Sequence, residues 1–148
     1  MAVGVSLKKD MYNAFKEKFE EIATEQDIKD IIPVIKIDGV INSKDINKET
    51  VKELEKLEPF GEKNKTPVFV YKNLKIDSIR SLTEGKHMKL TLKTENNNVI
   101  TAMGFNMGNR AEEFLIGDKV DVVGMLEVNE FNGYQTIQFN LKDIMKSL

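Results

Sequence analysis

Hydrophobic and polar residues alternate through most of the second half of the chain, a pattern typical of strands with one buried face. Residues 88–92, for example, alternate apolar side chains with lysine and threonine, so that one set would face a core and the other solvent. The pattern predicts five strands, at residues 68–79, 88–92, 99–105, 120–128 and 137–141. Asn109 is expected to cap a short helix after the third strand, and Asn132 with Gly133 predicts a hairpin between the last two.

The first 58 residues show a mixed pattern, in which apolar residues spaced by three or four positions indicate helices between short strands. The first two expected elements are a strand at residues 3–7 and a helix at 11–22 capped by Asp10. A strand at 34–37 then enters a turn at Asp38 and Gly39. The last element is a helix that follows Asn47 and stops before Pro59, with Val51, Leu54 and Leu57 facing inward. A segment this short exposes too much surface per buried atom to be a self-sufficient domain. It is therefore expected to be the end of a larger unit.

Pro59, Gly61 and Pro67 mark a connector between the two patterns. The sequence thus predicts a helix and strand segment over residues 1–58, a connector over 59–67 and a barrel over 68–148. Three strands, a short helix and two strands follow one another in the order of the OB-fold, a five-stranded Greek-key barrel. The predicted fold class is mainly β with an α+β N-terminal part, although another five-stranded barrel or sandwich would give the same order.

Charge adds a candidate surface, although the net charge of the chain is only −2. Between residues 72 and 93, six basic residues face two acidic ones, a local excess that would attract a phosphate backbone. In an OB-fold the second and third strands and two of the loops form the usual oligonucleotide site. The candidate binding residues are Lys72, Lys75, Arg80, Lys86, His87, Lys89 and Lys93, with Phe131 and Tyr134 at the hairpin as stacking aromatics. An ordinary solvated strand face rich in lysine is the alternative interpretation.

Other aromatic residues of the strands, Phe69, Tyr71 and Phe105, are more typical of a barrel core, and Phe139 is assigned to the core because it alternates with apolar neighbours. No catalytic residue is expected, because the sequence contains no cysteine, no Ser/His/Asp arrangement and no phosphate-binding glycine loop. The single histidine, His87, has no carboxylate pair at ligand spacing, so no metal site is expected either. No apolar run approaches the length of a membrane span and no secretory signal is evident, so a cytoplasmic location is expected.

The stretch from Leu57 to Phe69 resembles the connector Leu-Glu-Pro-Phe-Gly-x-Gly-Asn-Pro-x-Pro-x-Phe of RecJ-type single-strand-specific exonucleases. The matching positions are Pro59, Phe60, Gly61, Asn64, Pro67 and Phe69. The chain departs from the family at Lys63 and Lys65, where Gly and Pro are common. Residues 102–106, 117–122 and 129–133 look like the OB portion of the family, and residues 1–7 look like the segment after the Gly-Gly-His motif of its DHHA1 domain.

The resemblance implies the C-terminal region of an enzyme that degrades single-stranded DNA from the 5′ end in recombination and repair. The Mn²⁺ or Mg²⁺ ions of such an enzyme would be held by a DHH domain outside this chain, which carries no cofactor of its own. The implied partners are single-stranded DNA, the remainder of the exonuclease and other repair proteins, with no membrane. A structural or protein-interaction module that braces the exonuclease without touching DNA is the alternative.

Overall fold

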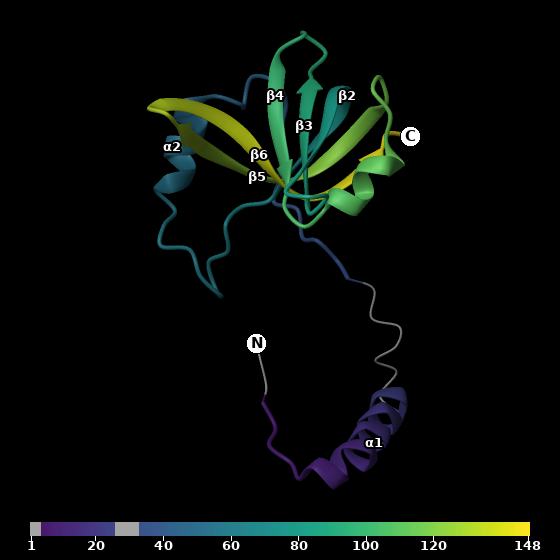
Figure 1. Ribbon diagram of the computed structural model, residues 1–148. Coiled ribbons are helices and arrows are strands. Elements are labelled where there is room, and N and C mark those ends of the chain that lie inside the picture. The colour runs from purple at the N-terminus through teal and green to yellow at the C-terminus, as the bar shows by residue number, and fades with distance from the viewer. Residues whose placement is uncertain (1–3, 26–32) are drawn as a thin grey trace. The chain divides into compact units, whose positions relative to one another are not determined.

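The computed structural model describes residues 4–25 and 33–148, and the chain divides into two units, residues 1–34 and 35–148. In the first unit a 3₁₀ turn, η1 (Lys9–Met11), leads into α1 (Tyr12–Glu25) (Figure 1). Within α1, the rings of Phe15 and Phe19 pack beside each other with centroids 6.0 Å apart. This confirms the predicted helix. The capping role of Asp10 is wrong, because the residue lies inside η1, and residues 4–8 form no strand; Val3 lies outside the described residues.

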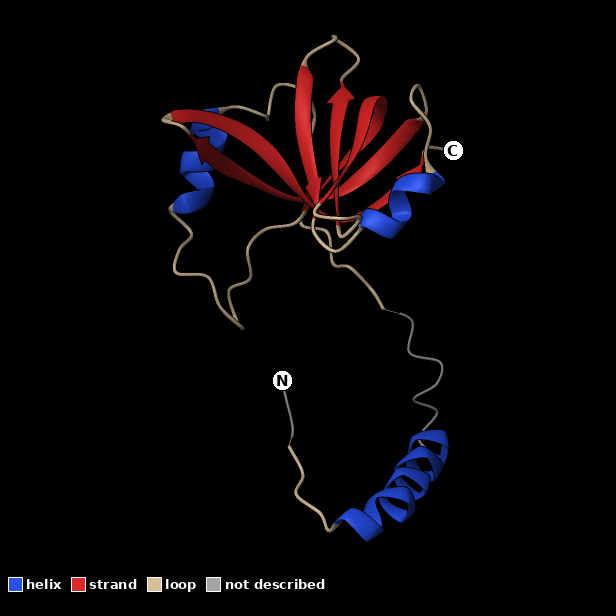
Figure 2. Cartoon of the chain, viewed as in Figure 1, coloured by secondary structure: helices blue, strands red, loops and turns tan. Residues whose placement is uncertain are grey.

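Strands are the main regular structure of the second unit (Figure 2). They are β1 (Gly39–Val40), β2 (Phe69–Leu82), β3 (His87–Lys93), β4 (Val99–Gly104), β5 (Lys119–Phe131) and β6 (Tyr134–Lys146), with the 3₁₀ helix η3 (Gly108–Glu113) between β4 and β5. The sheet runs in the order β1-β2-β3-β4-β6-β5, and β2 also pairs with β5. That last pairing closes β2 to β6 into the predicted five-stranded OB barrel.

Two bulges let β2 take part in both halves of the barrel. The register of β2 against β5 shifts between Tyr71 and Leu74, where Asn73 has a φ of 59°, and its register against β3 shifts between Ile76 and Ser78. Extra residues at such positions bend a strand and increase its twist. The first half of β2 therefore pairs with β5 and the second half with β3.

The barrel core consists of the apolar residues that the alternation placed inward. Met88, Leu90 and Leu92 of β3 are completely buried, and Phe139 of β6 lies with them in the same cluster. Each such side chain contributes roughly 1.5–3 kcal/mol by its removal from water. Tyr71 is buried too, which confirms its assignment to the core.

The segment before the barrel differs from its predicted boundaries. The strand falls at Gly39 and Val40 rather than at 34–37, and it pairs with Phe69 and Val70 of β2, so Gly39 is not in a turn. The helix α2 (Lys48–Glu55) starts as predicted, because Asn47 Oδ1 accepts a hydrogen bond from the Thr50 amide at 2.8 Å.

Val51 of α2 is buried, whereas Leu57, also predicted to face inward, lies beyond the helix and is exposed. The division between the two units falls between Val34 and Ile35, not at residue 58, because β1 pairs with β2 and Val51 joins the barrel core.

The connector contains no helix or strand and is held by its own polar groups. Gly61 and Asn64 exchange backbone hydrogen bonds, and the Asn64 side chain donates to the carbonyls of Leu57 at 2.7 Å and Pro59 at 3.1 Å. Lys63 and Lys65 flank this asparagine and are exposed. The turn thus depends on Asn64.

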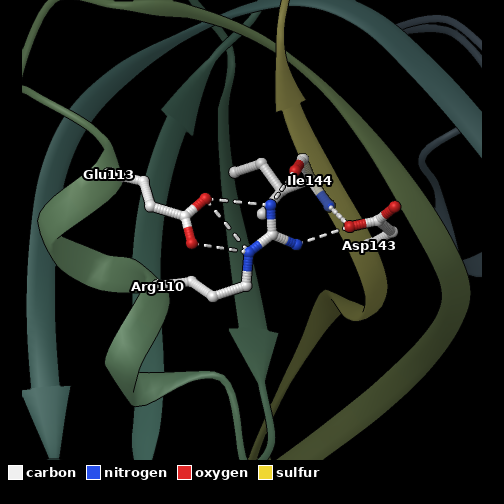
Figure 3. Close-up of polar contacts among 4 residues, drawn as sticks. All are labelled: Arg110, Glu113, Asp143 and Ile144. Atoms are coloured by element: carbon white, nitrogen blue, oxygen red, sulfur yellow. Dashed lines mark hydrogen bonds and ion pairs between the residues drawn. The ribbon is translucent and has the colours of Figure 1, made fainter.

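Arg110 fastens η3 to the last strand (Figure 3). Its guanidinium donates to the Asp143 carboxylate at 2.5 Å, to the Ile144 carbonyl at 2.8 Å and to Glu113, and the hydrogen bond with Glu113 contributes most to raising the pKa of Arg110. Asn109 was expected to cap this helix, but it lies within η3 and makes no cap.

The helix begins at Gly108, whose amide donates to the Lys86 carbonyl. A Cβ on Gly108 would overlap the carbonyl of Gly85, so only glycine permits this close approach of η3 to the β2–β3 loop.

Candidate nucleic-acid interface

The outer face of β3 and its neighbours carries the polar half of the alternation. Lys89 on β3 lies opposite Arg80 of β2 and opposite Met103 of β4, and both basic side chains are exposed. In the next row, Thr91 lies between Ser78 and Thr101. The outward direction predicted for the lysines and threonine of β3 is therefore confirmed.

A hollow of about 520 Å³ opens on this face, between β3 and β4 on one side and the hairpin of β5 and β6 on the other. Its lining residues are Lys89, Thr101, Asn129, Asn132, Tyr134 and Thr136. The lining combines one cation and one aromatic ring with hydroxyl and amide groups. These are the groups that could hold a sugar–phosphate backbone and stack a base.

The hairpin that forms one wall has the predicted tight turn. Phe131 pairs with Tyr134, and Asn132 and Gly133 have φ values of 50° and 78°. Positive φ at both central residues is the hallmark of a type I′ turn, which matches the twist of the flanking strands. The turn presents Tyr134 with 77% of its surface exposed, whereas the side chain of Phe131 lies outside the described residues.

Of the predicted binding residues, the structure brings Lys89 and Tyr134 together in the hollow. Thr101, Asn129, Asn132 and Thr136 also line it and were not predicted as binding residues. Asn129 and Thr136 face each other across β5 and β6. Their outward parity was readable from the alternation, but their approach to Lys89 depends on the parallel pairing of β4 with β6, which no local pattern reveals.

Lys93 and His87 lie on the same face but have local partners. Lys93 Nζ lies 2.6 Å from Asp77 Oδ1, so its charge is largely balanced. His87 Nδ1 accepts a hydrogen bond from the Asn106 amide at 3.0 Å, and its ring meets Phe105 edge-on at 5.4 Å. Phe105 is 47% exposed, so its assignment to the core is wrong: it extends the outer face beyond Met103.

The remaining candidates lie outside the lining of the hollow. Lys86 belongs to the loop between β2 and β3, and Lys72 lies beside the first bulge of β2. Lys75 pairs with Lys119 of β5 as well as with Lys93. All of the predicted lysines apart from Lys93 are exposed, and their contact with nucleic acid stays a prediction.

A buried tyrosine supports the end of the β3–β4 hairpin. The Tyr71 hydroxyl donates to Glu95 at 3.1 Å, and Ser43 donates to the same carboxylate at 3.1 Å. Burial, followed by the adjacent Glu95, raises the pKa of Tyr71 to about 12. The pKa of Glu95 is lowered, first by a backbone hydrogen bond within Glu95 itself.

Nothing in the described ranges resembles a metal centre or a membrane span. No group of three or more histidine, aspartate or glutamate side chains there could hold a metal ion. No helix there has the length and apolar character needed to cross a bilayer.

Comparison with known proteins connects this geometry to one family. A family model described as the RecJ OB domain matches residues 37–143. The single-stranded-DNA-specific exonuclease RecJ of Bacillus subtilis is 32% identical over 148 residues, an alignment that covers 97% of this chain and 18% of that protein. The protein of the same name from Haemophilus influenzae is 28% identical over 141 residues, which are 93% of this chain and 24% of its own length.

Among solved structures, the crystal structure of RecJ in complex with Mn²⁺ from Thermus thermophilus superposes with a TM-score of 0.69 at 22% identity, covering 98% of this chain and 20% of that one. The fold is thus shared with that structure. The chain spans about a fifth of the length of these relatives.

Proposed function

Because this chain belongs to the family of RecJ OB domains, we propose that its barrel binds single-stranded DNA in the hollow between the β3–β4 face and the β5–β6 hairpin. The observation that supports this most strongly is the lining itself. The ammonium group of Lys89 can neutralise a phosphate, and the exposed ring of Tyr134 can stack a base. Arg80, opposite Lys89 on β2, would extend the basic surface along the strand.

We propose further that the chain positions DNA for hydrolysis carried out elsewhere in a RecJ-like single-strand-specific exonuclease. The relatives are named for that activity, and the chain matches about a fifth of their length. Mn²⁺ or Mg²⁺ would then act in the catalytic part. The same proposal includes a role in recombination and repair and a cytoplasmic location. It also includes a DHHA1 origin for the first unit, and contacts of the chain with the rest of the enzyme and with other repair proteins.

Titration of a fluorescently labelled oligothymidylate with the 148-residue chain, at two salt concentrations, tests the binding proposal. Tyr134→Ala should weaken binding by about 1–3 kcal/mol through lost stacking. Lys89→Ala should weaken it and lower the slope of log affinity against log salt by about 0.7, the value for one phosphate contact on a single strand.

Lys56→Ala is the matched control, because Lys56 is an exposed lysine of the same unit that pairs with Glu53 and does not line the hollow. Affinity that does not change with salt, or an equal loss in Lys56→Ala and Lys89→Ala, would contradict the proposed site. A chain that binds no single-stranded DNA would favour the structural or protein-interaction role instead.

A further inference from the structure

Three polar side chains form the floor of the outer face next to the hollow. Glu127 on β5 lies opposite Gln138 on β6, and Asn140 follows two residues later on the same face. Gln138 is in register with Thr101 of β4, and Thr136 precedes it on the same face of β6; both threonines line the hollow. The polar surface of the hollow thus continues along the outer face of β6 into Glu127, Gln138 and Asn140.

The chemistry of the carboxylate fixes the orientation of both amides. An ionised carboxylate only accepts hydrogen bonds, so the amide nitrogens must point toward it. Gln138 Nε2 lies 2.5 Å from Glu127 Oε1, and Asn140 Nδ2 lies 3.2 Å from Glu127 Oε2. The amide oxygens Gln138 Oε1 and Asn140 Oδ1 consequently point away from the carboxylate.

Asn140 is half-buried and Gln138 is buried with 9% of its surface exposed, but neither amide oxygen is completely enclosed. Neither accepts a hydrogen bond from any described residue, and among those residues no fully buried side-chain nitrogen or oxygen lacks a partner. Each carboxylate oxygen also has more than one lone pair. The floor therefore presents mainly acceptors, together with a negative charge.

A negative floor is unsuited to phosphate, since like charges repel, so a nucleotide placed there would turn its base toward the floor. The exocyclic amino groups of cytosine, adenine and guanine each offer two N–H donors, whereas thymine offers a single ring N–H between two carbonyl acceptors. We propose that Glu127, Gln138 and Asn140 read the bases of the bound strand and favour a base with an exocyclic amino group over thymine. This inference rests on the proposed function, because it concerns the strand held in the same hollow.

The test compares fluorescently labelled oligodeoxycytidylate and oligodeoxythymidylate of 12 nucleotides (a length of about the size that one OB-fold covers), each titrated with the 148-residue chain at pH 8. Base preferences in such proteins ordinarily come from stacking and backbone flexibility rather than from hydrogen bonds. If the floor reads an amino group, the chain should bind oligodeoxycytidylate more tightly than oligodeoxythymidylate, by about fivefold or more. Glu127→Gln should bring the two affinities close to one another, because the new amide adds a donor, and should tighten oligodeoxythymidylate binding by removing a negative charge.

Glu112→Gln is the matched control, because it removes an exposed glutamate of η3 that makes no side-chain hydrogen bond within the described residues. It should leave the preference unchanged. Equal affinity of the unaltered chain for the two oligonucleotides, or a preference that survives in Glu127→Gln, would overturn the inference while leaving DNA binding intact. Failure to bind either oligonucleotide would overturn the proposed function itself. Since the unaltered chain alone supplies the first comparison, the inference is testable even if the variant does not fold.

Discussion

Replacing Arg110 with methionine should destabilise the barrel by about 2–3 kcal/mol, because the change keeps an apolar stem but removes the guanidinium, whose Cζ lies 6.0 Å from the centroid of the Phe114 ring, with every hydrogen bond that it makes. The Ile144 carbonyl loses a donor in a half-buried position, which costs roughly 1 kcal/mol. The Asp143 contact is charged and short but half exposed, so it contributes about 1–1.5 kcal/mol. The Glu113 pair, three residues away on the same short helix, adds only about 0.3–0.5 kcal/mol.

Urea denaturation followed by circular dichroism measures this loss, which should lower the midpoint by roughly 1–2 M for a domain of this size. Arg80→Met is the control, because Arg80 is exposed on β2. The free energy of unfolding of this variant should lie within about 0.5 kcal/mol of that of the unaltered chain. Asp143→Asn combined with Arg110→Met gives a double-mutant cycle for the pair. An Arg110→Met loss below about 0.5 kcal/mol, or one matched by Arg80→Met, would refute the idea that this guanidinium fastens η3 to β6.

Gly108→Ala should destabilise the barrel by at least about 1–3 kcal/mol, since the new Cβ would overlap the Gly85 carbonyl. Gly61→Ala should change stability little, because a Cβ there would lie in open space, and urea denaturation of both variants makes the comparison. The raised pKa of Tyr71 leads to a prediction about pH. Because the pKa in the folded state, about 12, lies above the unfolded value of 10, Tyr71 contributes stability that is fully present below pH 10 and is lost as the pH rises through about 12. The unfolding free energy of the unaltered chain should therefore fall relative to that of Tyr71→Phe between pH 10 and 12, and parallel pH profiles of the two proteins would contradict the stated cause of the shift.

The strands of the barrel could be predicted because each obeys a local rule. Alternation over residues 88–92 fixed which side chains of β3 are buried, and Asn132 with Gly133 identified the hairpin from two residues. The end of β2 was underestimated by three residues, since Arg80 and Ser81 break the apolar pattern while still pairing with β3.

Features that depend on distant pairings could not be predicted. Gly39 joins a strand only because Phe69 lies beside it, so the boundary between the units was misplaced. Lys93 meets Asp77 because the bulge after Ile76 changes which residues of β2 face outward, and no spacing in the sequence encodes that bulge. The hollow likewise needs β4 and β6 in register, so its threonines and asparagines were overlooked.

The hollow straddles the seam at which the barrel closes. One wall belongs to the β2–β3–β4 meander and the other to the β5–β6 hairpin, and each of these can form from neighbouring segments of the chain. Their union through β2–β5 and β4–β6 joins residues far apart in the chain, and such pairings require the entropy cost of loop closure to be met first. The hollow therefore does not exist on either half alone, and if it holds a single strand as proposed, bound DNA would stabilise the closed barrel by an amount that rises with the logarithm of the DNA concentration.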